Sequence, residues 1–282
     1  MSVSINQLRD MSSLFMRSEV NRWLKSDFES IDMKLKRYNL LEKNKGKSYL
    51  QVLRKTYKTI AQYYPNEYVV KNEFISQRVK ELLGTSKSVV FNEFRIGKAI
   101  ADLALFNGDS KVFEIKTVLD KEYRLNSQLT EYKKIFNFVY IIVPIEHLER
   151  YDTYDIEVGI ITYNQTFSEF KVQREADKNL NLNVDVLMEV LHSKEYLKII
   201  ADNFELPDEI NAFNQFEISK KLISTLSTDC LNRIFVETMK KRDINNLFFN
   251  KVNCEFNQIC LSMNLKKEER DHMISNLRKT IT

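Results

Sequence analysis

The sequence is poor in glycine, proline and cysteine, with 5 Gly, 3 Pro and 3 Cys among 282 residues. Scarce glycine and proline exclude long flexible linkers and favour a helix-rich chain. Cys230, Cys254 and Cys260 form neither a disulfide ladder nor a C-x-x-C pair, and no histidine lies close enough in sequence to complete a zinc site. We therefore expect free thiols in a reducing compartment.

A long apolar run is also missing. No stretch approaches the roughly 18 apolar residues that a membrane-spanning helix requires, and the first twenty residues lack the apolar segment of a signal peptide. Neither charge sign dominates, since 43 Lys+Arg against 39 Asp+Glu leave a net charge of +4. This charge permits a nucleic-acid partner without demanding one. We expect a cytoplasmic globular protein with no membrane partner.

Helical periodicity occupies both ends of the chain. Residues 5–64 carry apolar positions at helical spacing, and Pro65 ends this region. Helical patterns return from Val184 onward, over 184–203, 208–226, 227–241, 243–263 and 266–280. With a boundary at Pro207, we predict an N-terminal helical region (1–65), a sheet-containing core (66–206) and a C-terminal helical domain (207–282).

The predicted core begins with a helix and continues with extended segments. Asn66 is a suitable N-cap for a helix from about Glu67 to Leu83, which Gly84 would close. The pattern then predicts strands at 88–95, 99–106, 111–117 and 138–143, a helix at 123–136, and a further hairpin within 158–172. Asn107-Gly108-Asp109 is a strong hairpin signal between the second and third strands. The chain therefore predicts an α/β fold with an αβββαβ core and a mixed sheet.

Two of the predicted strands carry acids among apolar residues. Asp102 should share a strand face with Ile100, Ala104 and Phe106, while Ala101, Leu103 and Leu105 occupy the other face. Glu114 and Lys116 point to one face of the next strand. If the hairpin pairs these strands, Asp102 and Glu114 come within reach of one cation, which relieves their repulsion. Mg²⁺ suits carboxylate oxygens, and Lys116 can offset charge on a phosphate.

The order Asp102, Glu114-Ile115-Lys116 resembles the PD-(D/E)XK nuclease superfamily, over residues 67 to 144. Gln128 and Tyr132 match the Gln-x-x-x-Tyr motif of many members, whereas Ala101 replaces the motif's proline. The segments NEFRIGKAIADLALFNG and EIKT also resemble those of a little-described group of bacterial and phage proteins within this superfamily. The resemblance implies a restriction-endonuclease-like fold. It further implies that Asp102, Glu114 and the Ile115 carbonyl hold Mg²⁺ or Mn²⁺, with Lys116 and Gln128 as catalytic partners.

Members of that superfamily often carry a further acid on the first core helix or first strand. Glu73 and Glu93 are the candidates, and the strand phase favours Glu93 as a second metal ligand beside Asp102. Lys98, Arg124 and Tyr132 flank the expected cleft and are candidates for nucleic-acid contacts. Exposed cations are more often simply solvated.

The pattern E-x-K is weak by itself, because it occurs at Glu114, Glu131 and Glu169. Glu131 falls on a predicted helix. Glu169 lies in a predicted strand downstream of Asp155, but no glutamine-bearing helix and apolar strand follow it. A purely structural explanation for Asp102, Glu114 and Lys116 is a cross-strand ion pair on a half-exposed sheet.

These patterns together favour a Mg²⁺-dependent nuclease that acts on DNA. Defence against phage or mobile elements is one biological role that would suit such an enzyme. Two alternatives stay open: an RNA-cleaving member of the same superfamily, and a non-catalytic module that binds nucleic acid or protein on the same fold. The helical regions are expected to serve substrate grip, a partner protein or homodimerisation.

Overall fold

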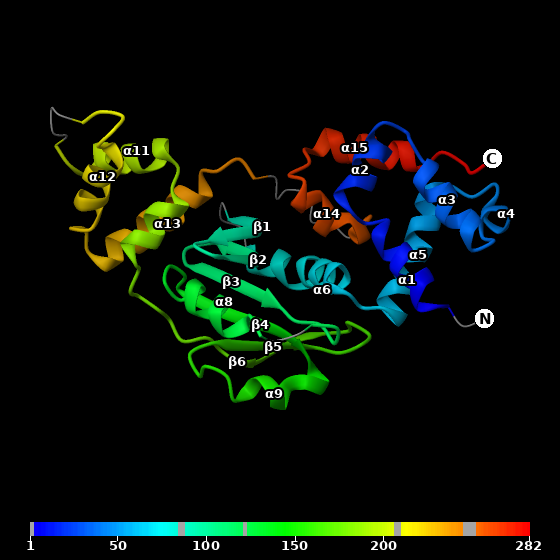
Figure 1. Ribbon diagram of the computed structural model, residues 1–282, viewed down its shortest axis with the longest axis horizontal. Coiled ribbons are helices and arrows are strands. Elements are labelled where there is room, and N and C mark those ends of the chain that lie inside the picture. Colours follow the sequence, from blue (N-terminus) through cyan, green and yellow to red (C-terminus); the bar gives the residue numbers. More distant parts are fainter. Residues whose placement is uncertain (1–2, 84–87, 121–122, 206–209, 245–251) are drawn as a thin grey trace.

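The computed structural model describes residues 3–83, 88–120, 123–205, 210–244 and 252–282. A six-stranded sheet occupies the middle of this elongated molecule, and helices gather at both of its ends (Figure 1). Both chain termini lie in the same helical group. The expected cap at Gly84 and the expected boundary at Pro207 fall outside the described residues.

The N-terminal region is helical, as predicted. Its helices are α1 (Ile5–Ser13), α2 (Arg17–Leu24), α3 (Glu29–Arg37), α4 (Leu41–Asn44) and α5 (Tyr49–Tyr63). Ser48 begins α5 with a capping box, in which its hydroxyl accepts from the Gln51 amide while the Gln51 side chain accepts from the Ser48 amide. The buried side chains of α5 face the other helices of this region.

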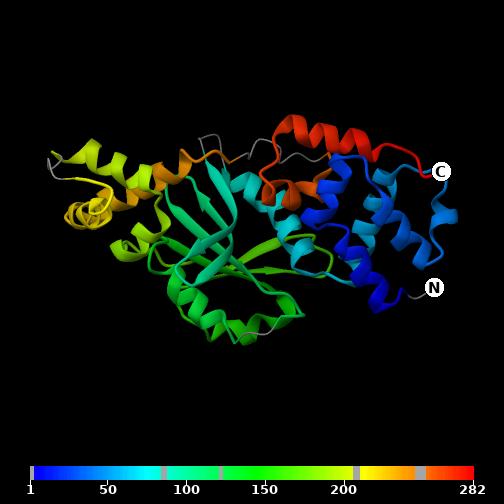
Figure 2. The same ribbon diagram turned by 45° about the horizontal axis from the view of Figure 1, so that its top comes forward.

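The helix expected at 67–83 is present. It runs as α6 (Glu67–Phe74), a π-helical stretch η1 (Ile75–Val79) and α7 (Lys80–Leu83). Asn66 is its N-cap, because the side chain accepts from the Val69 amide at 3.3 Å. Figure 2 shows α6 beside the sheet, on the side of the N-terminal helices.

The sheet confirms the predicted order of strands and adds the hairpin at its far edge. The strands are β1 (Val89–Ile96), β2 (Ala99–Phe106), β3 (Ser110–Ile115), β4 (Phe138–Pro144), β5 (Gly159–Tyr163) and β6 (Phe170–Arg174), in spatial order 1 to 6. The pairs β1–β2, β2–β3 and β5–β6 are antiparallel, whereas β3–β4 and β4–β5 are parallel. The sheet is therefore mixed, and β4 at its centre is almost entirely buried.

Short helices connect the parallel strands. The crossover from β3 to β4 contains α8 (Leu125–Tyr132), which is shorter than the predicted 123–136 helix. The connection from β4 to β5 contains η2 (Ile145–His147) and α9 (Leu148–Asp152). The hairpin β5–β6 completes the sheet. Helix α8 lies beside β3, because Tyr132 of α8 donates to Glu114 of β3.

The C-terminal part is helical, but the helices predicted at 208–226 and 243–263 are shorter than expected in the described residues, and a third prediction also differs. Its helices are α10 (Val184–Val190), α11 (Ser193–Asn203), α12 (Gln215–Ile223), α13 (Thr228–Lys240), η3 (Cys254–Phe256), α14 (Asn257–Ser262) and α15 (Lys267–Leu277). The helix expected at 184–203 is two helices, because Leu191 and His192 adopt extended backbone conformations between α10 and α11. Within the described residues, no helix is long and apolar enough to cross a membrane.

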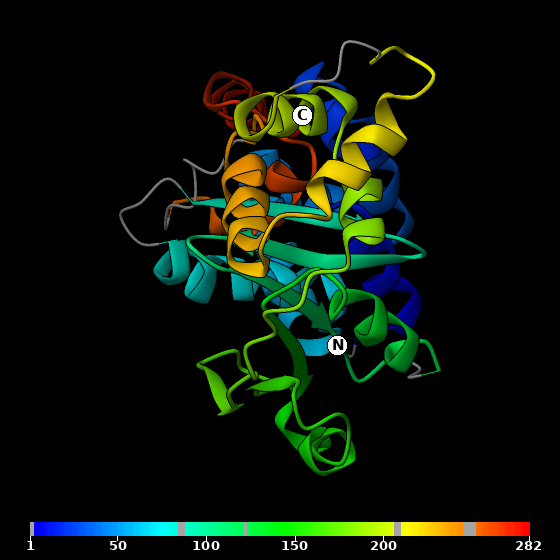
Figure 3. The same ribbon diagram turned by 90° about the vertical axis from the view of Figure 1, so that its left-hand side faces the viewer.

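Two hydrophobic cores lie on opposite faces of the sheet. The first packs the N-terminal helices, α6, η3, α14 and α15 together, while the second contains α8 and α10 to α13 (Figure 3). The predicted C-terminal helical domain of residues 207–282 is therefore not a separate packing unit. Its first helices belong to one core and its last helices to the other, where residues near Ile281 also bond to the segment before α5.

Candidate functional site

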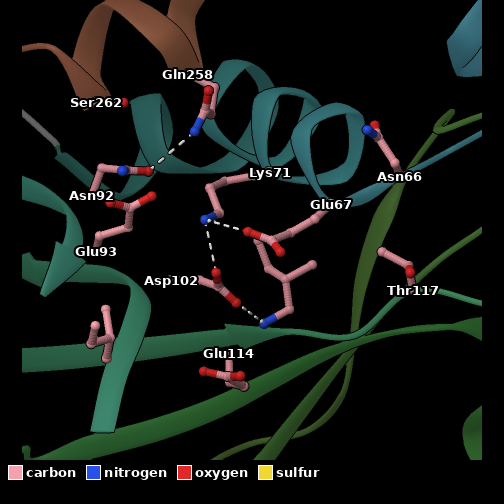
Figure 4. Close-up of polar contacts among 12 residues, drawn as sticks. Asn66, Glu67, Lys71, Asn92, Glu93, Asp102, Glu114, Thr117, Gln258 and Ser262 are labelled. Carbon is pink, nitrogen blue, oxygen red and sulfur yellow. Dashed lines mark hydrogen bonds and ion pairs between the residues drawn. The ribbon is translucent and has the colours of Figure 1, made fainter. Parts of the chain in front are cut away.

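The candidate site forms where β2 and β3 diverge. The last ladder pair joins Leu103 to Phe113, and beyond it the Asp102 carboxylate, rather than a backbone carbonyl, accepts from the Ile115 amide at 2.7 Å. Asp102 therefore lies at the open end of the β2–β3 hairpin, which we call the hairpin mouth. Its carboxylate is partly buried between the strands and α6 (Figure 4).

The predicted assignment of the β2 side chains to the two faces of the sheet is confirmed only in part. Ala104 and Phe106 pack in the second core and Leu103 and Leu105 in the first, but Ala101 joins the second core instead of the first. The β1–β2 pairing is interrupted at the same level, because Asn92 pairs with Leu103 and Phe94 with Ala101 while the residues between them are unpaired, and Glu93 there has a left-handed backbone with φ of 57°. A non-glycine residue in that conformation interrupts the alternation of side chains along the strand pair.

Glu114 is the centre of a buried hydrogen-bond network on the α8 side of the sheet. One carboxylate oxygen accepts from Lys116 Nζ at 2.8 Å and from Gln128 Nε2 at 2.7 Å, and the other accepts from Tyr132 Oη at 2.6 Å. Lys116 Nζ also donates to Gln128 Oε1 at 3.2 Å. Glu114 is 3% exposed and Lys116 7% exposed. The structure thus brings four of the predicted site residues into one cluster.

Burial raises the pKa of Glu114 to about 7, and the negative charge of Asp102 adds to the effect. Hydrogen bonds from Lys116 and Tyr132 and the charge of Lys116 oppose it. The same surroundings raise the pKa of Tyr132 well above its usual range, so its hydroxyl stays a donor. The negative charge of Asp102 therefore acts on Glu114 across the hairpin mouth.

This shift predicts how the stability of the metal-free chain depends on pH. Because the pKa of folded Glu114 is about 7 against a usual value of 4.5, the folded state holds more protons between these pH values. The free energy of unfolding should therefore fall as pH rises through this window. In Glu114→Gln, which cannot titrate, the fall should be smaller. Urea unfolding in EDTA at pH 5 and pH 8 measures both, with exposed Glu157→Gln as control; equal falls in all three chains would contradict the shift.

Two site residues on α6 were missed by the sequence reasoning. Lys71 is 1% exposed, and its ammonium lies 2.7 Å from Asp102 Oδ1 and 2.9 Å from Glu67 Oε1 (Figure 4). Partial burial raises the pKa of Glu67; Lys71 opposes this rise and the charge of Asp102 adds to it. The i, i+4 spacing of Glu67 and Lys71 is the one available signal, and that spacing is usual for a solvated helix face.

Glu93, expected beside Asp102 as a second metal ligand, is paired with an arginine in this structure, and its role as a ligand stays a prediction. Glu93 is half exposed, and its carboxylate accepts from Arg17 at 2.7 Å. Its left-handed backbone turns it away from the regular strand phase on which the expectation depended. The other candidate, Glu73, accepts from Tyr57 and Gln77 instead.

The residues expected to contact nucleic acid divide into two kinds. Lys98, in the β1–β2 turn, and Arg124, which begins α8, are exposed. Arg124 lies over the ring of Tyr123 at 5.1 Å, and that ring is 73% exposed. Tyr132 is fully buried and bonds to Glu114, so its expected role in direct nucleic-acid contact is wrong in this structure.

The rival E-x-K segments form no comparable cluster. Glu131 lies on α8, as predicted, and pairs with Lys134. Glu169 and Lys171 are exposed, and Asp155 pairs with Lys133 at 2.5 Å. The structure therefore brings together the Asp102, Glu114 and Lys116 register and leaves the Asp155, Glu169 and Lys171 register dispersed.

The oxygen atoms at the hairpin mouth are suitable ligands for a hard cation. In the present conformation, however, they are not arranged to bind one. Asp102, Glu114, Glu67 and the Ile115 carbonyl offer only oxygen donors, which Mg²⁺ prefers. Within the described part of the chain, however, no three acidic, histidine or cysteine side chains converge closely enough to hold a metal ion. Lys71 provides the positive charge at Asp102 instead.

Comparisons with known proteins place the chain in a family. A solved protein of unknown function from Silicibacter pomeroyi is 14% identical, with 50% of this chain and 92% of that chain covered at a TM-score of 0.33. No curated protein matches the sequence significantly. Residues 60–263 match the family of bacteriophage P4 protein cII, a range that contains the whole sheet and every site residue described above. The chain therefore belongs to the bacteriophage P4 protein cII family.

Proposed function

We propose that the chain is a metal-dependent nuclease that hydrolyses phosphodiester bonds, with DNA as the favoured substrate. The observation that supports this proposal best is the convergence of Glu114, Lys116 and Gln128 beside Asp102, at the mouth of the β2–β3 hairpin. This arrangement places two acids and a buried ammonium group on adjacent strands, with the ammonium group bonded to Glu114. The restriction-endonuclease-like assignment of the αβββαβ core is part of the same proposal.

Asp102, Glu114 and the Ile115 carbonyl would hold Mg²⁺, with Mn²⁺ as a substitute. Such an ion, when bound, polarises a phosphate and lowers the pKa of a bound water. Lys116 would offset the negative charge that develops on the phosphate, because its ammonium is held at a defined position by Glu114 and Gln128. Tyr132 holds the second oxygen of Glu114, which fixes the orientation of the carboxylate.

Incubation with plasmid, single-stranded DNA and RNA tests the proposal and separates its variants. Each substrate is treated with Mg²⁺, Mn²⁺ or EDTA under one set of conditions. We expect metal-dependent cutting of DNA. Cutting of RNA alone would identify the RNA-cleaving alternative, whereas metal-dependent binding without cutting would identify the non-catalytic module. A specific observation favours that module as the second candidate, since Lys71 already neutralises Asp102.

Arg124 is proposed to contact the nucleic-acid backbone at the entrance to the site. We expect Arg124→Ala to weaken DNA binding a few-fold, because one phosphate contact is lost. The slope of the logarithm of the binding constant against the logarithm of the salt concentration should become shallower by about one. Filter binding in EDTA at several salt concentrations measures both quantities. Lys198→Ala is the control, since Lys198 is exposed on distant α11. An unchanged salt slope in Arg124→Ala would contradict the contact.

The biological setting belongs to the proposal too. A nuclease of this kind suits defence against phage or mobile elements, and membership of a family named for a bacteriophage protein suits a nuclease that a mobile element itself carries. Genes found beside family members distinguish the two settings: neighbouring defence genes support the first, and integrase or replication genes support the second.

A further inference from the structure

The Lys71 ammonium lies between two carboxylates and is almost completely shielded from solvent. It is 1% exposed and contacts a carboxylate of α6 and a carboxylate of β2, namely Glu67 and Asp102. Burial of an ammonium group is costly unless it is paired, and here the two carboxylates pair with it. Their charges raise the pKa of Lys71 above its usual value, against the effect of burial, so the group is positively charged.

Asp102 has no carboxylate oxygen that is free of a donor. Oδ1 accepts from Lys71 and Oδ2 accepts from the Ile115 amide. A divalent ion bound to Oδ1 would lie close to the ammonium, and two like charges at that separation repel strongly in a partly buried site. Lys71 and a metal ion therefore exclude each other at Asp102.

We propose that Lys71 is an internal counter-ion that competes with the divalent metal for Asp102. This inference rests on the proposed function, because it requires a metal at the hairpin mouth. With Lys71 in place, three carboxylates (Glu67, Asp102 and Glu114) face two ammonium groups, those of Lys71 and Lys116. The metal binds after the flexible stem of Lys71 moves its ammonium away from Asp102. Among the residues that the structure describes, no three acidic side chains converge as a metal site would require, which agrees with this resting arrangement.

The competition predicts a gain of metal affinity on removal of a site residue. Lys71→Met keeps the length and apolar stem of the side chain but loses the charge, so it should bind Mn²⁺ at least about tenfold more tightly than the native chain. Isothermal titration with MnCl₂ measures the affinity. Lys71→Arg keeps the charge and should show no gain. Lys198→Met is the matched control, because Lys198 also pairs with a carboxylate four residues away on its helix but is exposed and distant.

A second measurement covers the case in which Lys71→Met is poorly folded without metal. Its thermal unfolding in EDTA and in Mn²⁺ is compared with that of the native chain. The inference requires Mn²⁺ to raise the melting temperature of Lys71→Met more than that of the native chain. A smaller or equal rise would overturn it.

The outcomes separate this inference from the proposed function. Equal or weaker Mn²⁺ binding by Lys71→Met, beside measurable binding by the native chain, would overturn the competition and leave the metal site standing. No binding by any chain would overturn both. The tighter binding must also disappear when Asp102→Asn is added to Lys71→Met. A gain that survives this second substitution would place the metal elsewhere and overturn the inference.

Discussion

Lys116→Ala should lower the rate of metal-dependent DNA cleavage by about 10²- to 10³-fold, which is the usual effect of removing one group that stabilises developing charge. Lys116 is 7% exposed and is held by Glu114 and Gln128. The fold should persist, because Glu114 keeps its bonds to Gln128 and Tyr132 after the substitution. Single-turnover cleavage at saturating protein measures the chemical step without the contribution of binding.

Lys171→Ala is the matched control for this experiment. Lys171 is also the lysine of an E-x-K segment, but it is exposed on β6 and lies apart from the hairpin mouth. Its loss should leave the cleavage rate unchanged. A loss of cutting in Lys171→Ala together with full activity in Lys116→Ala would move the site to the Glu169 segment and contradict our assignment.

Phe256→Ala should destabilise the protein by about 3–5 kcal/mol, the usual cost of removing a fully buried phenylalanine ring. Phe256 is 0% exposed, and its ring lies 6.0 Å from that of Trp23 and 6.1 Å from that of Phe15. A residue near the C-terminus thus completes the core of the N-terminal helices. Urea unfolding followed by tryptophan fluorescence and by circular dichroism measures the loss, since Trp23 is the single tryptophan.

Phe213→Ala provides the comparison, because Phe213 is 100% exposed. Its removal should change the free energy of unfolding by less than about 0.5 kcal/mol. Similar small effects of both substitutions would contradict the shared core and would instead support the independent C-terminal domain that the sequence predicted.

The order of elements around the sheet could be predicted because local patterns determine it. The continuous apolar run of β4, the Asn107-Gly108-Asp109 turn and the cap at Asn66 each act over a few residues. The packing of the last helices could not be predicted in the same way. The bond from Asn276 to the Trp23 carbonyl joins residues 253 positions apart, and no local pattern encodes such a contact.

A site residue could be predicted where its charge interrupts an apolar pattern. It could not be predicted where its spacing is ordinary for its secondary structure. Asp102 and Glu114 stand out because they interrupt apolar strands. Lys71 does not stand out, because a lysine four residues after a glutamate is ordinary on a helix surface. Glu93 is a third case, since neither its left-handed backbone nor its pairing with Arg17 has a signature in the sequence FNEFR.

The central claim is that the hairpin mouth cleaves phosphodiester bonds, and cleavage of end-labelled DNA by the native chain and by Asp102→Asn tests it most directly. The substitution keeps the shape of Asp102 and removes the charge that faces the Ile115 amide and Lys71. We predict cutting by the native chain in Mg²⁺, none in EDTA, and at least about a 10²-fold loss in Asp102→Asn. Equal cutting by both chains, or no cutting by the native chain in any metal, would contradict the claim.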